Sequence, residues 1–328
     1  MNRQQSKTEL ESRIRQSERR HMCLVASDRP EGKRLARAAE VGKLMQPMPR
    51  LFARPEYWEI LDPVERVLHC MRSLQLLHPA WTYVGPSAGL VYGLEIPDDE
   101  SYLWPIRIAA RWGSRGRSTP QLLRQVVEGD DVVVVDHLRV TSIERTAFDC
   151  MREMSFADGL AVMDSALAAS GLTRNQMIIR MNQFRRTSRG GRHAMEAANY
   201  GDGAARGYGE SCLRAALIEA GFEIPQLHVD VTTSEGTDIH GTFGWIMDDG
   251  SWIVARLASP RYAEAQPEDD DNVCILTIPR TMVHDGEAFT ALLEEAGVPH
   301  AAEPPRVGIA KAFKPVHRGL DDAEDEDE

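Results

Sequence analysis

The segment from residue 139 to residue 170 constrains the fold of this chain more than any other. Four consecutive valines at 132–135 precede it and predict a short buried strand. Thr141 and Glu144 then stand three residues apart, the spacing of a capping box at the start of a helix. A second helix is predicted after this one, because apolar residues recur on one face at a period of 3.6. These residues are Phe156, Leu160, Met163 and Leu167. The sequence therefore predicts a strand that runs into a helical hairpin.

Length and composition are those of a globular protein with more than one domain. The chain has 328 residues, of which 42% are hydrophobic and 6% aromatic, enough for two or three domains with their own cores. No apolar run is long enough to cross a membrane, and the N-terminus lacks a signal-peptide core, so we expect a cytoplasmic protein. The cysteines show no C-x-x-C spacing, which indicates reduced thiols rather than a zinc site or a disulfide framework. They are Cys23, Cys70, Cys150, Cys212 and Cys274.

Charge is distributed unevenly between the two ends of the chain. The net charge is −12, yet residues 1–54 hold 13 Lys and Arg against 6 Asp and Glu. The last eight residues hold seven carboxylates, and we expect residues 301–328 to form a disordered acidic tail. Such a tail is either inert solvated chain or a mimic of DNA that masks the basic end. The two charged ends are therefore expected to have separate roles.

Residues 1–58 are predicted to form a helical arm followed by a winged-helix-like segment. A basic helix begins after Pro30 and ends at Gly42, and a short hairpin is expected from Leu44 to Ala53. In a winged helix the recognition helix enters the major groove of DNA and the hairpin contacts phosphates. A solvated basic helix face is the alternative interpretation. The candidate DNA-binding residues are Lys33, Arg34, Arg37, Lys43, Arg50 and Arg54.

Residues 59–200 are expected to form an α+β middle domain. A single helix is predicted over 59–79, then a strand–helix unit of small residues that ends at Pro97, then a strand from Leu103 to Ala110. A basic link follows this strand and is either a set of phosphate contacts or a solvated loop. Its arginines are Arg111, Arg115 and Arg117.

Residues 209–300 are predicted to form a C-terminal α/β domain. A helix from Glu210 to Ala220 opens it, and a helix from Glu287 to Ala296 closes it. Asp249 and Gly250 predict the turn of a hairpin between two of its strands. The predicted strands cover residues 227–232, 239–247, 251–257 and 273–278.

Three stretches of the chain resemble the AbiEi-type family of bacterial antitoxins and regulators. The first is V-T-S-x-E-R-T-x-x-D at residues 140–149, followed by D-x-A-L at 164–167. The second is G-K-L-x-x-P-x-x-R-L-F-A-R-P-E-Y-W at 42–58, and the third is the small-residue segment at 85–94. The resemblance implies a DNA-binding winged helix joined to this middle domain. Members of that family often carry a nuclease-like domain at the C-terminus.

The C-terminal domain resembles Vsr-like, restriction-endonuclease-like domains through its opening G-E-S-x-L-R at 209–214. Those enzymes hold Mg²⁺ with a helix Glu, an Asp on the second strand in D-[FY]-x-W, and a Glu on the third strand in E-[FLY]-D-G. Glu210 retains the helix acid, but Thr242 and Arg256 occupy the two strand positions. Neither replacement is a Mg²⁺ ligand, since that ion requires oxygen donors of the carboxylate kind. The resemblance therefore implies a degenerate nuclease site that holds no metal.

These features predict a multidomain α+β and α/β protein that acts as a bacterial DNA-binding regulator resembling AbiEi-type antitoxins. Its C-terminal domain is expected to be catalytically inactive, with no catalytic residues and no cofactor. The expected partners are duplex DNA and, where one exists, a cognate toxin protein. Two alternatives stay open. One is a Mg²⁺-dependent Vsr-like endonuclease that uses Glu210 with relocated carboxylates, and the other is a non-enzymatic interaction module.

Overall fold

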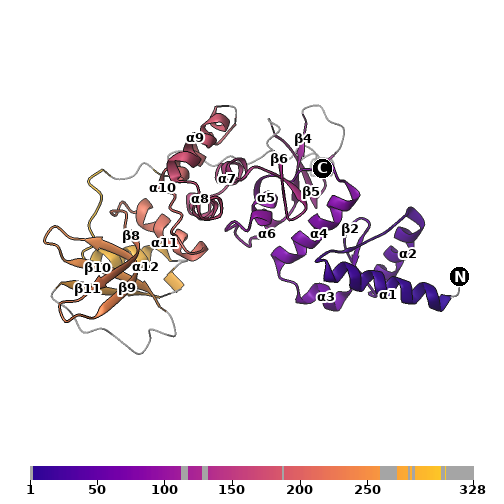
Figure 1. Ribbon diagram of the computed structural model, residues 1–328, viewed down its shortest axis with the longest axis horizontal. Coiled ribbons are helices and arrows are strands. Elements are labelled where there is room, and N and C mark those ends of the chain that lie inside the picture. The colour runs from indigo at the N-terminus through magenta and orange to yellow at the C-terminus, as the bar shows by residue number, and fades with distance from the viewer. Residues whose placement is uncertain are drawn as a thin grey trace, which may run out of the picture. The chain divides into compact units, whose positions relative to one another are not determined.

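A computed structural model describes residues 3–111, 117–127, 132–186, 188–258, 272–279, 281–282, 285–303 and 307. Helices and several small sheets share these residues, which confirms the expected mixed α+β class (Figure 1). The chain divides into two compact units between Thr146 and Ala147. The boundary expected between residues 200 and 209 thus lies inside the second unit. Arg115, residues 259–271 and most of the acidic tail expected at 301–328 fall outside the described residues.

The first unit begins with two helices, a short strand between them and a hairpin. The elements are α1 (Arg3–Arg19), β1 (Leu24–Val25), α2 (Arg29–Glu40), β2 (Met45–Met48) and β3 (Leu51–Ala53). The strands form an antiparallel sheet in the order β1-β3-β2. Ile14, Leu24, Leu35, Leu44 and Phe52 fill the core between helices and sheet. The expected basic helix and hairpin are both present.

The rest of the first unit, as far as it is described, is built from four helices and two pairs of strands. Its helices are α3 (Pro55–Ile60), α4 (Pro63–Leu77), α5 (Gly85–Tyr92) and α6 (Glu100–Leu103). Its strands are β4 (Ile106–Ala110), β5 (Leu122–Val126), β6 (Val132–Val135) and β7 (Leu138–Thr141). Tyr83 joins the parallel pair β4–β5 to the antiparallel pair β6–β7, since it bridges Ile108 on one side and Val140 on the other. Its hydroxyl donates to the Met71 carbonyl oxygen at 2.6 Å, which fixes α4 to the sheet.

Four local predictions in this unit are wrong. The single helix over 59–79 is two helices, because Pro63 lacks an N–H and the Asp62 side chain caps the new start by accepting from the Glu65 N–H at 2.8 Å. The strand from Leu103 begins only at Ile106. The valine strand lies at the edge of its pair, so Val134 is 65% exposed rather than buried.

The capping box of Thr141 and Glu144 is also absent. Thr141 is the last residue of β7, and its hydroxyl bonds to the Thr146 hydroxyl at 2.8 Å. Ser142 occupies the cap instead, with its Oγ 3.4 Å from the Arg145 nitrogen, and the helix α7 runs over Ile143–Met151.

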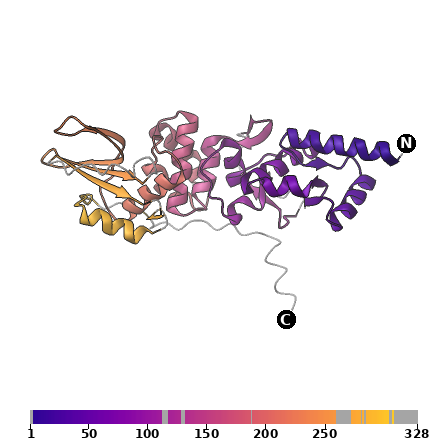
Figure 2. The same cartoon turned by 90° about the horizontal axis from the view of Figure 1, so that it is seen from below.

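The second unit places a helical layer before a four-stranded sheet. Its helices are α8 (Phe156–Ser170), α9 (Arg174–Arg185), α10 (Gly191–Tyr200), α11 (Tyr208–Glu219) and α12 (Gly286–Glu295). The apolar face predicted for α8 is confirmed, since Phe156, Leu160, Met163 and Leu167 are all buried. α8 packs against both α10 and α11. Figure 2 shows α12 alongside the sheet, where it also packs against α11.

The sheet of the second unit follows the predicted strands closely. It consists of β8 (Gln226–Thr232), β9 (Asp238–Ile246), β10 (Trp252–Leu257) and β11 (Val273–Ile278), in the order β11-β10-β9-β8. The first three strands are antiparallel, and β11 runs parallel to β10. None of the described helices is long and apolar enough to cross a membrane.

Candidate nucleic-acid interface

The start of α2 is held by two carboxylates, those of Asp28 and Glu31. Asp28 caps the helix by accepting from the Glu31 N–H at 2.7 Å. The Glu31 carboxylate accepts from the Arg13 guanidinium at 2.6 Å and from the Ser27 hydroxyl at 2.6 Å. The hydrogen bond from Arg13 is the main reason that the pKa of Glu31 is lowered to about 2. Glu31 therefore fixes α2 to α1, which carries Arg13.

The two faces of α2 differ in character. Leu35 is 1% exposed and belongs to the core of the first unit. Lys33, Arg34 and Arg37 stand on the other face and are exposed to solvent. Within the described chain Lys33 and Arg37 have no hydrogen-bond or ion-pair partner, whereas Arg34 lies 3.5 Å from Glu31. Lys33 and Arg37 on this helix are therefore available to bind an external anion.

The hairpin after α2 presents two further basic residues. Gly42 lies two residues after the end of α2 and has a φ of 72°. The exposed Lys43 follows it and has no side-chain partner among the described residues. Arg50 lies at the tip of the β2–β3 turn with a φ of 69°. Its Nη2 donates to the Ala26 carbonyl at 2.9 Å, so this guanidinium partly stabilises the turn.

Arg54 has an acidic partner. Its Nε and Nη2 donate to the two carboxylate oxygens of Glu18 at 2.7 and 2.5 Å. This hydrogen bonding raises the pKa of Arg54. Since Glu18 balances its charge, Arg54 links β3 to α1 and is the weakest of the six candidates as a DNA contact.

Two basic features of this unit were missed in the sequence. Arg29 is exposed at the start of α2, one turn before Lys33, and the i,i+4 spacing could have identified it. The second feature is a stack in which the His78 and Trp81 rings lie 3.8 Å apart, with the Arg124 guanidinium 5.5 Å from the Trp81 ring. Burial, then the charges of Arg50 and Arg124, lower the pKa of His78. No sequence signal links residues 78 and 124.

The basic link of the middle segment is described only in part. Arg111 and Arg117 are exposed, and Arg115 lies outside the described residues. No hydrogen bond or ion pair joins either of these two described arginines to α2.

The three positions of the nuclease-like motif lie on α11, β9 and β10. Glu210 is buried, and its Oε1 lies 3.0 Å from Nε2 of His228, a residue that the sequence did not identify. Burial raises the pKa of Glu210. The Thr242 hydroxyl accepts from the Leu257 N–H at 3.4 Å. Arg256, the residue before Leu257, is half-buried.

The acids that could act as relocated metal ligands are Asp238, Asp248 and Asp249, which lie at the start of β9 and in the turn after it. Asp238 is the first residue of β9 and accepts from the Thr232 hydroxyl at 2.7 Å. Asp249 lies in the β9–β10 turn and accepts from the Ser251 hydroxyl at 2.6 Å. Both are committed to local turn contacts.

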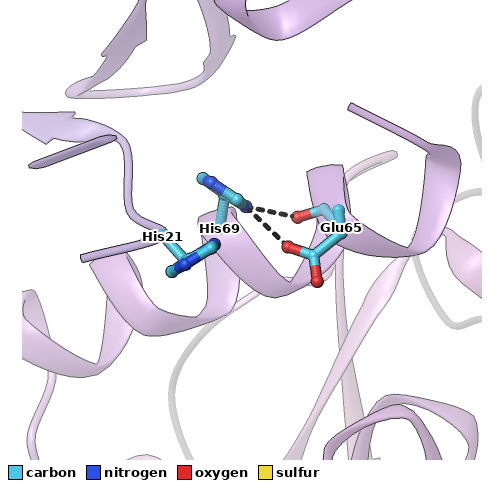
Figure 3. A group of neighbouring side chains, drawn as sticks. All are labelled: His21, Glu65 and His69. Carbon is cyan, nitrogen blue, oxygen red and sulfur yellow. Dashed lines mark hydrogen bonds and ion pairs between the residues drawn. The ribbon is translucent and has the colours of Figure 1, made fainter. Parts of the chain in front are cut away.

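Across the described chain, one group of three metal-type ligands lies close together. It comprises His21, Glu65 and His69 of the first unit (Figure 3). No family model, curated protein or solved structure matches the chain in comparisons with known proteins.

Proposed function

We propose that the chain is a bacterial DNA-binding regulator of the AbiEi-antitoxin type, which contacts duplex DNA through α2 and the β2–β3 hairpin. The proposal depends on one observation, the exposed cations on α2 and at Lys43 just after it. Lys33, Arg37 and Lys43 lack internal partners among the described residues, while Leu35 anchors the opposite face. Phosphates are the natural counter-charges for such a face.

The order of elements supports this use of α2. A helix, a strand, a second helix and a hairpin with sheet order β1-β3-β2 are the components of a winged helix. Two helices precede the hairpin, one fewer than in a three-helix DNA-binding domain. We therefore propose binding dominated by phosphate contacts, with Arg29 and Arg50 beside the three cations.

The C-terminal part of the chain has a binding role in this proposal. Glu210 faces an imidazole rather than further carboxylates, so the position has lost the donors that would hold Mg²⁺. We infer a catalytically inactive nuclease-like domain that serves contacts with DNA or with a cognate toxin protein in the bacterial cytoplasm.

The proposal is tested by titrating the full chain into fluorescently labelled duplex DNA over a series of salt concentrations. The expected result is binding whose log K falls linearly with log salt, with a slope of about −3 or steeper, because each neutralised phosphate contributes close to one unit. Affinity that does not depend on salt, or the absence of binding at low salt, would refute the proposal.

A further inference from the structure

The cluster of His21, Glu65 and His69 is assembled from two separate segments. Glu65 and His69 stand at i,i+4 on α4, which places them on the same face. His21 follows α1 and has a φ of 52°, in the left-handed region. One ligand-type atom from each residue lies within 4.8 Å of the others. Figure 3 shows both imidazoles beside the Glu65 carboxylate.

A buried oxygen in this cluster lacks a hydrogen bond. Oε2 of Glu65 is shielded from solvent and has no hydrogen-bond donor. Its nearest nitrogen neighbours are Nδ1 of His69 at 3.3 Å and Nη1 of Arg72 at 4.0 Å. Arg72 is engaged elsewhere, since it donates from Nε and Nη2 to Asp136 at 3.1 Å. A shielded carboxylate oxygen beside two imidazoles is a position where a cation is stabilised.

We propose that His21, Glu65 and His69 bind one divalent transition-metal ion of the zinc class. Two imidazole nitrogens and one carboxylate oxygen form the protein donor set of an open four-coordinate zinc site, with water as the fourth ligand. At metal–ligand distances of about 2.0–2.1 Å, tetrahedral donors lie roughly 3.3–3.4 Å apart. Glu65 and His69 already stand 3.3 Å apart. His21 is exposed, so its side chain can move to complete the set.

Nε2 of His69 lies beside the Tyr57 hydroxyl, which can either donate a hydrogen bond to it or accept one from it. When no ion is bound, Nδ1–H donates to the Glu65 carbonyl oxygen at 2.7 Å, and Nε2 accepts from the Tyr57 hydroxyl at 2.9 Å. An ion on Nδ1 replaces the hydrogen bond to the Glu65 carbonyl oxygen, so binding requires the His69 ring to turn away from that oxygen. The ring proton then lies on Nε2, which donates to the Tyr57 oxygen. The Tyr57 O–H in turn donates to the Glu18 carbonyl at 3.2 Å. Such an outer partner is the usual support of a metal-bound histidine.

Metal binding would connect the segment between α1 and β1 to α4, because His21 lies in that segment. An ion that binds the folded protein and not the unfolded chain stabilises the fold in proportion to the logarithm of its concentration. The proposal is independent of DNA binding and needs no nucleic acid for its test.

The experiment uses the full chain after treatment with a chelator. Titration with ZnCl₂ by calorimetry should give one equivalent, and CoCl₂ should produce the visible absorption of four-coordinate Co²⁺. The unfolding midpoint should rise with the logarithm of Zn²⁺ concentration. The proposal would be overturned if titration gave no heat of Zn²⁺ binding and no Co²⁺ absorption at one equivalent.

Variants assign the ion to these residues. His21→Ala and Glu65→Gln should each weaken Zn²⁺ binding by at least about tenfold, and Tyr57→Phe by about 10–100-fold, the usual effect of losing an outer-shell partner. His78→Ala and Glu59→Gln are matched controls with exposed side chains, and they should bind Zn²⁺ like the wild type. In the absence of zinc, the double variant His21→Ala/Glu65→Gln should have the same unfolding midpoint as the wild type. Wild-type Zn²⁺ affinity in this double variant would place the ion elsewhere and refute the site.

Discussion

Glu31 is the residue on which the position of α2 most depends. The Glu31→Gln variant should lower the free energy of unfolding of the first unit by about 1–2 kcal/mol at pH 7, after allowance for solvent screening of Arg13. The pKa of Glu31 falls from 4.5 to about 2 in the folded protein. Its stabilisation is therefore complete above pH 4.5 and is lost as the pH falls toward 2.

Urea unfolding of both proteins at several pH values checks this prediction. The difference between wild type and Glu31→Gln should shrink between pH 4.5 and 2. A difference that stays constant over this window would show that the carboxylate charge has no role.

Asp164 and Arg214 connect two of the sequence motifs through a buried ion pair. Asp164 of D-x-A-L accepts from Ser211 at 2.7 Å and from Arg214 at 2.6 Å, both within G-E-S-x-L-R. Burial raises the pKa of Asp164, and the Arg214 charge opposes that shift. Both side chains are almost fully buried, so the motifs stabilise the contact between α8 and α11.

Removing one member of this pair should be costly. Arg214→Met leaves a buried carboxylate without its cation and should lower the free energy of unfolding by about 3–5 kcal/mol. Adding Asp164→Leu should restore most of this loss, while Arg174→Met, at an exposed position on α9, serves as the control. Urea unfolding that shows Arg214→Met and Arg174→Met to be equally stable would contradict the role of the pair.

At the scale of elements, Gly244 determines how closely β8 and β10 approach β9. A Cβ at Gly244 would lie 2.6 Å from Cγ2 of Val229 and 3.1 Å from Cζ3 of Trp252. Gly244→Ala should therefore destabilise the second unit by about 1–3 kcal/mol. Gly286 is the matched control, since its Cβ would meet nothing closer than Ala216 at 3.9 Å. Thermal unfolding should show a midpoint below that of the wild type for Gly244→Ala and an unchanged midpoint for Gly286→Ala. Equal midpoints in the two variants would contradict this packing.

Elements with strong local signals could be predicted from the sequence. The strands of the second unit follow the alternation of apolar residues, and α8 follows its helical period. The break before α4 was missed although Pro63 and Asp62 carry the signal. The exposure of β6 could not be predicted, because four valines do not show whether a neighbouring strand covers them.

Contacts between distant residues could not be predicted at all. Tyr83 joins two strand pairs, and His228 meets Glu210, through pairing that no local pattern encodes. The same is true of His21 and His69. The exposure of the α2 cations was predicted, since it follows from helical period, whereas the pairing of Arg54 with Glu18 depends on tertiary structure.

At the scale of the whole molecule, the surroundings of Glu210 bear on whether the protein cleaves DNA. Its Oε1 faces His228, and Asp238 and Asp249 are held in local contacts. Purified protein should leave duplex DNA intact with Mg²⁺ or Mn²⁺, as judged on a sequencing gel. Cleavage that disappears in Glu210→Ala would instead favour an endonuclease.

The central claim is that the α2 face binds DNA phosphates. Lys33, Arg34 and Arg37 are changed together to Ala, and a triple of exposed arginines on α9 and its C-cap serves as the control. These are Arg174, Arg185 and Arg186. A second comparison replaces the arginines of the middle-segment link, Arg111, Arg115 and Arg117.

The decisive measurement is the slope of log K against log salt for each variant on the same duplex. The α2 triple should flatten the slope by about two to three units, since each lost phosphate contact removes close to one. Its circular dichroism and unfolding midpoint should match the wild type because the side chains are exposed. An unchanged slope in the α2 triple, or an equal loss in the α9 triple, would contradict the claim.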